Sequence, residues 1–129
     1  MKEIKPNSFE AVAIFVMYIC YQDEEISIEE IDQFESDLDI LKRLYLDMNG
    51  ELIAYDFKKS LKKIITLLES DRQFLNKKLS SYEINFFNKI ITDEKLQNLA
   101  MLEAKHAAES DGFHKKEKSK FLQWQKIWM

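Results

Sequence analysis

The sequence predicts an all-α fold: a compact single-domain helical bundle of about six to eight helices over residues 1–129. Only two glycines and one proline occur, which leaves little turn chemistry for a many-stranded β fold. The hydrophobic residues, 46% of the chain, recur at helical rather than alternating spacings. A length of 129 residues fits one soluble domain, and no linker or low-complexity segment divides it.

The first helix is expected at about residues 8–22. Asn7-Ser8-Phe9-Glu10 has the form of a capping box, and the run that follows is apolar on all sides, as in a central buried helix. A second capping box, Ser27 to Glu30, begins a helix that Asn49-Gly50 should end. The apolar stripe of this second helix is Ile31, Phe34, Leu38, Leu41 and Tyr45.

The second half of the chain carries four more helix signals. An amphipathic stripe runs from Phe57 to Leu68, Ser80 to Glu83 forms another capping box, and Thr92-Asp93-Glu94 precedes a helix through Ala108. Asp111-Gly112 breaks that helix. The final helix places Phe121, Trp124 and Trp128 on one face, which favours a core role, with an interface as the alternative.

Charge and cysteine content exclude several classes of protein. The net charge of −4 argues against general nucleic-acid binding, and the acidic run from Asp23 to Asp39 is expected to be a solvated helix face. Cys20 is the only cysteine and should be a packing residue. The apolar run from Ala11 to Tyr21 is shorter than the roughly 20 residues of a membrane span, so we expect no transmembrane segment and a cytoplasmic location.

One local pattern occurs twice, near either end of the chain. An apolar helix runs into a turn led by Asp23 or Asp111, and the helix that follows carries Glu30 or Glu117. Such a repeat predicts two related helical hairpins that arose by internal duplication.

These motifs, with Ala107 to Gly112 in the second copy, resemble those of the TerB-like (tellurite-resistance) helical family. The resemblance implies a compact helical domain in which acidic residues of these turns bind cations. Asp23, Glu30, Asp111 and Glu117 are the corresponding metal-ligand candidates. The chain departs from the family pattern at Glu24, where a glycine usually follows the turn aspartate. Its two Asp-to-Glu spacings also differ, being seven residues in the first copy and six in the second.

The residues themselves support a cation site and an alternative. Acidic side chains beside the carbonyl end of the first helix are unfavourable by roughly 0.3–1 kcal/mol each, which a bound cation would relieve. Carboxylate and carbonyl oxygens suit calcium or magnesium. In the alternative the acids serve only as caps, since Glu30 is already explained as the reciprocal partner of Ser27.

Other motifs give weaker signals. Tyr45 to Asp56 resembles an EF-hand loop around Asp47, Asn49 and Gly50, but it has too few carboxylates, and a helix-ending turn is favoured. Glu103 and His106 have the Glu-x-x-His spacing of di-iron bundles without a second copy, which favours a partly buried structural histidine. Neither a catalytic triad nor a glycine-rich phosphate loop can be assembled.

We therefore expect a non-enzymatic TerB-like module that binds a divalent cation, calcium or magnesium, in a stress-response or envelope-associated system. The alternative is a structural module for protein–protein interaction or self-association without metal. An oxygen-activating metalloenzyme ranks below both.

Overall fold

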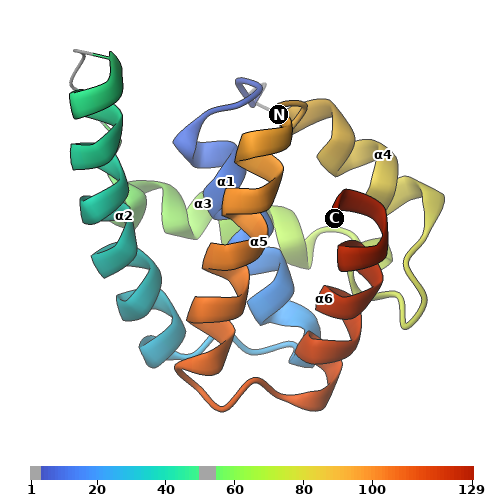
Figure 1. Ribbon diagram of the computed structural model, residues 1–129. Helices are drawn as coiled ribbons and strands as arrows, with labels where there is room; N and C mark the ends of the chain where they lie inside the picture. Colours follow the sequence, from blue (N-terminus) through green and yellow to red (C-terminus); the bar gives the residue numbers. More distant parts are fainter. Residues whose placement is uncertain (1–3, 50–54) are drawn as a thin grey trace.

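The structure is a computed structural model that describes residues 4–49 and 55–129, with the backbone alone at 44–49. In these ranges the chain forms six α-helices, two short 3-10 helices and no strand, which confirms the predicted all-α class (Figure 1). The elements are α1 (Phe9–Cys20), η1 (Tyr21–Asp23), α2 (Ile28–Asn49), α3 (Phe57–Glu69), η2 (Arg72–Leu75), α4 (Ser81–Ile90), α5 (Glu94–Glu109) and α6 (Lys115–Trp128).

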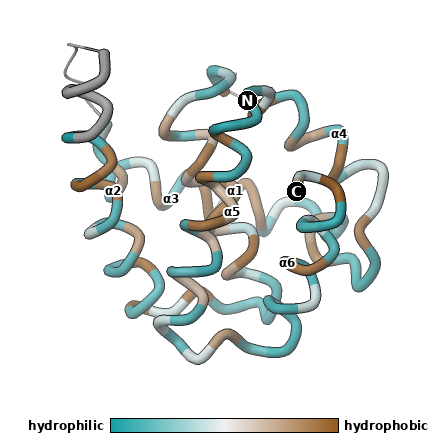
Figure 2. Tube along the Cα trace, viewed as in Figure 1, coloured by the Kyte–Doolittle hydropathy of each residue, from teal (hydrophilic) through white to brown (hydrophobic). Residues whose placement is uncertain are grey.

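Helix α1 forms the centre of the bundle. Every residue from Ala11 to Cys20 is buried, as its uniformly apolar sequence predicts. Helices α3, α5 and α6 pack directly on α1, whereas α2 packs against the outer side of α5. Figure 2 shows hydrophobic residues concentrated in the middle of the bundle and hydrophilic ones along α2 and in the loops at the lower end.

The predicted caps Ser27, Ser80 and Asp93 are confirmed, whereas Ser8 instead of Asn7 caps α1, and Asp56 caps α3. The side chains of Ser8, Asp56, Ser80 and Asp93 each accept a backbone N–H from the first turn of the helix that follows. Helix α2 is described as far as Asn49, and Gly50, which was expected to end it, lies outside the described residues. Most of the segment from Tyr45 to Asp56 that resembles an EF-hand loop, residues 45–54, lies outside the residues whose side chains are described.

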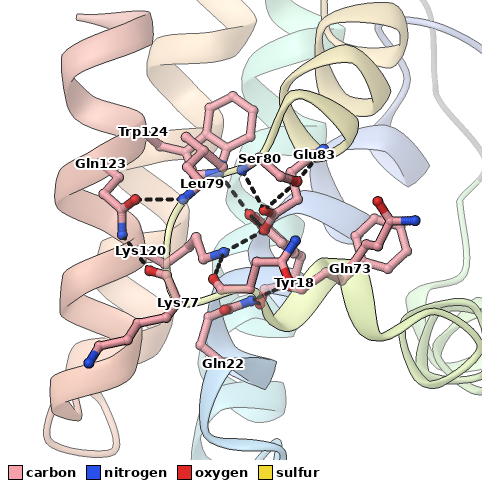
Figure 3. A network of polar contacts seen from close by, with 12 residues as sticks. Tyr18, Gln22, Gln73, Lys77, Leu79, Ser80, Glu83, Lys120, Gln123 and Trp124 are labelled. Atoms are coloured by element: carbon pink, nitrogen blue, oxygen red, sulfur yellow. Dashed lines mark hydrogen bonds and ion pairs between the residues drawn. The ribbon is translucent and has the colours of Figure 1, made fainter.

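A buried polar network joins α1, α4 and α6 (Figure 3). The Glu83 Oε1 atom accepts from the Tyr18 hydroxyl at 2.7 Å and from the Lys120 ammonium at 2.5 Å. The Trp124 indole N–H in turn donates to the Tyr18 oxygen at 3.0 Å. Burial lowers the pKa of Lys120, while the paired Glu83 carboxylate opposes that shift. The network therefore holds the C-terminal helix against the core by specific bonds as well as by apolar contact.

The aromatic face of α6 belongs to the core. Trp124 is fully buried and Trp128 is 7% exposed, and both rings pack on Phe15 of α1. The interpretation of this face as an exposed interface is therefore wrong. No helix in the described ranges has both the length and the apolar character needed to cross a membrane.

We expect Trp124→Ala to lower the free energy of unfolding by about 3–5 kcal/mol, because it removes a large ring from a closely packed centre. Leu122→Ala is the matched control in the same helix, since the Leu122 side chain is 46% exposed, and should cost less than about 1 kcal/mol. Urea unfolding followed by circular dichroism measures both. Equal losses in the two variants would contradict a core role for α6.

Candidate metal centre

The two Asp-led turns meet at one end of the bundle. The α1–α2 turn and the α5–α6 turn both lie at the lower end in Figure 1, and η1 packs against α6. The residue after each aspartate is left-handed, with φ of 64° at Glu24 and 89° at Gly112. Each of these residues also donates its N–H to the carbonyl three residues earlier. The sequence repeat thus corresponds to a shared turn geometry, and Glu24 adopts the conformation for which glycine is usual.

Glu30 and Glu117 are held in the same way at the start of α2 and α6. Glu30 Oε1 accepts the Ser27 N–H at 2.9 Å, and Glu117 Oε1 accepts the His114 N–H at 2.9 Å. Both side chains are fully buried, yet the Oε2 atom of each has no hydrogen-bond partner. Capping therefore accounts for one oxygen of each carboxylate. The other oxygen lacks a hydrogen-bond partner, which is rare for a buried polar atom.

The two glutamates with unpartnered oxygens lie among other potential ligands. Ligand atoms of Cys20, Glu30 and Glu117 lie within 4.8 Å of one another, and so do those of Asp23, His114 and Glu117. We name these five residues the turn cluster. Its inner members are buried, whereas Asp23 is partly exposed and His114 is exposed. The cluster therefore runs from the core to the surface.

The structure places two of the predicted ligands, Asp23 and Glu30, each close to a third, Glu117, and the fourth, Asp111, beside His114. Asp23, Glu30 and Glu117 belong to the turn cluster. Asp111 contacts it through His114, whose Nε2 lies 3.3 Å from Asp111 Oδ2. Asp111 is thus placed to orient the imidazole. His114 was not among the predicted ligands, although it precedes α6 in the way that Ser27 precedes α2.

Burial and proximity control the charge of the cluster. The first turns of α2 and α6 present positive helix ends, which favour carboxylates. Nevertheless, burial and the adjacent Glu30 carboxylate raise the pKa of Glu117 to about 9, so this pair shares one proton at neutral pH. Burial, followed by the charges of Glu30 and Glu117, also raises the pKa of Cys20 well above its usual range. Cys20 is therefore a neutral thiol and an inert packing residue, as predicted.

A divalent cation could take the place of the shared proton. Asp23, Glu30 and Glu117 supply carboxylate oxygens, which suit calcium or magnesium. His114 adds a nitrogen donor, which extends the choice to manganese or zinc. The chemistry of the donor set therefore fits a cation, with no bond to Cys20 required.

The acidic run of α2 is not a uniformly solvated face, and that expectation is wrong at two positions. Glu30 is fully buried and Asp37 is 9% exposed, while Glu29, Asp32 and Asp39 are exposed or partly so. Glu30 and Asp37 are seven residues apart, so they share one side of α2, beside Phe34 and Leu38. Their position next to the apolar stripe distinguishes these two acids from the exposed acids of the same helix.

Comparison with protein-family models, with curated proteins and with solved structures gives no match to this chain. The resemblance to the TerB-like family therefore stays a prediction, based on the residues of the two turns.

In the absence of metal, the stability of the protein should fall as pH rises between about 5 and 9. The folded state keeps the Glu117 proton up to a pKa of about 9, whereas a free glutamic acid loses it near 4.5. The folded state therefore binds more protons throughout this window, and raising the pH favours unfolding.

Glu117→Gln tests this assignment by urea unfolding in chelator at pH 5.5, 7 and 8.5. A glutamine keeps the acceptor for the His114 N–H and can donate its amide to Glu30, so the variant should lose this part of the pH dependence. Glu25→Gln, at an exposed position, is the control and should keep it. Parallel pH profiles for wild type and Glu117→Gln would refute the shared proton.

Proposed function

We propose that this protein is a non-enzymatic helical module that binds a divalent cation in the turn cluster. Asp23, Glu30 and Glu117 would provide oxygen ligands, with His114 as a nitrogen ligand and Asp111 as the residue that orients it. In this proposal the ion joins the first and second halves of the chain, because its ligands come from both turns.

The observation that carries the proposal is the pair of buried, unpartnered oxygens on Glu30 and Glu117. Two carboxylates in contact in a dry site must hold either a proton or a cation between them. The surface edge of the cluster is formed by Asp23, which is partly exposed, and by His114, which is exposed. Calcium and magnesium fit the carboxylates alone, whereas use of His114 favours manganese or zinc.

The resemblance to the TerB-like family supports the same residues and adds a setting. By that resemblance the module acts in a stress-response or envelope-associated system, with a cytoplasmic location. Cation binding would then change the stability of the junction between the two hairpins, which a partner protein could detect.

The alternative is a structural interaction or self-association module in which the shared proton is permanent. With the aromatic face of α6 buried, the surface available to it is the acidic outer side of α2, where Glu29, Asp32 and Asp39 lie. This alternative predicts that no ion stabilises the protein.

A melting series against calcium, magnesium, manganese and zinc tests the proposal. At least one ion should raise the melting temperature of the wild type, because a ligand at 100 times its Kd adds about 2.7 kcal/mol to the stability of the folded state. Asp23→Asn should reduce the shift strongly and Asp111→Asn partly. Glu25→Gln removes the same charge near the turn, at an exposed position, and should leave the shift unchanged.

Two results would contradict the proposal. An unshifted wild type in every ion would favour the permanent proton and the structural alternative. Equal shifts in the wild type and Asp23→Asn would mean that the ion binds elsewhere in the chain.

A further inference from the structure

A second group of potential ligands lies at the contact between α2 and α5. Ligand atoms of Asp37, Glu103 and His106 lie within 4.8 Å of one another. We name these three residues the interface cluster. It shares no member with the turn cluster. Asp37 lies within α2, whereas Glu103 and His106 lie within α5.

Hydrogen bonds hold Asp37 by both oxygens. Gln33 Nε2 donates to Asp37 Oδ1 at 3.1 Å, and His106 Nδ1 lies 2.6 Å from Asp37 Oδ2. His106 is not the partly buried histidine expected from the sequence, because its side chain is 54% exposed. The imidazole can therefore move without disturbing the core, while the aspartate is fixed.

Glu103 supplies the observation that points to a ligand. It lies on the buried face of α5 among Ala100, Ala104 and Ala107, is only 7% exposed, and its Oε2 atom has no hydrogen-bond partner. A buried carboxylate oxygen without a partner is costly. Burial, followed by the hydrogen bond and the charge of the neighbouring Asp37, raises the pKa of Glu103 to about 8.

The cluster is accessible from the surface. A cavity of about 310 Å³ is lined by Glu103 and His106 together with Leu102, Lys105 and Glu109. Glu103 and His106 are the members of the interface cluster that line this cavity. An ion could enter here and keep water on its open side.

We propose that Asp37, Glu103 and His106 form a second cation site, which takes a first-row transition-metal ion such as zinc. One imidazole nitrogen and two carboxylate oxygens suit such an ion better than calcium or magnesium. Three protein ligands leave a coordination position open toward the cavity. Zinc ligands at about 2.0–2.2 Å from the ion lie roughly 3 Å or more apart, so His106 would move slightly away from Asp37 on binding.

Zinc titration of the Asp23→Asn/Glu117→Gln protein tests this site separately from the turn cluster. Isothermal titration calorimetry should find one zinc ion per chain. Adding Asp37→Asn or His106→Gln should weaken binding by at least about tenfold, whereas adding Glu109→Gln should not. Glu109 lines the same cavity and carries the same charge, so it controls for nonspecific attraction.

The nitrogen signals of the His106 imidazole in NMR spectra provide a direct readout of ligation, and they should shift on addition of zinc. The exposed His106→Gln variant keeps the test valid even if Asp37→Asn fails to fold. Absence of zinc binding to the double variant, or binding that His106→Gln leaves unchanged, would overturn the second site. Neither result bears on the turn cluster, because the double variant lacks two of the carboxylates proposed to bind an ion there.

Discussion

The enclosure of α1 determines much of this structure. A helix that is apolar on every side must be surrounded by other elements, and α3, α5 and α6 pack on α1. Helix α4 adds Glu83, whose carboxylate accepts a hydrogen bond from the Tyr18 hydroxyl of α1. The C-terminal end of α1 at Cys20 is consequently buried where α2 and α6 begin. The N-terminal glutamates of those two helices, Glu30 and Glu117, are thereby forced into the same dry space.

Local and tertiary structure impose different demands on those glutamates. Capping uses one oxygen of each to satisfy a backbone N–H, a role set within three residues of sequence. Packing of the two turns then brings the two carboxylates together and leaves the other oxygen of each without a donor. The capping and cation-binding interpretations are therefore compatible, because they concern different atoms of the same side chains. A proton or an ion completes the arrangement, and pH decides how readily one replaces the other.

Helix boundaries could be predicted because caps and stripes act over a few residues, as Ser8, Ser80 and Asp93 illustrate. The repeat also predicted that Asp23, Glu30 and Glu117 occupy related turns, and the structure places Asp23 and Glu30 close to Glu117. His114 was missed because its ring reaches the cluster only when α6 meets η1. Asp37, Glu103 and His106 could not be grouped, since Asp37 and His106 are 69 positions apart and meet only through helix packing. The pairing of Lys120 with the buried Glu83 could not be predicted for the same reason.

In the proposed site, Glu30 and Glu117 share a proton that a cation replaces. Calorimetric titration of calcium, magnesium, manganese and zinc, each into the Asp37→Asn protein at pH 7.5 in two buffers of different ionisation enthalpy, counts the protons released by whichever ion binds. The pKa of Glu117, about 9, predicts release of about one proton for each ion bound. Binding without proton release, or no binding at all, would contradict the claim.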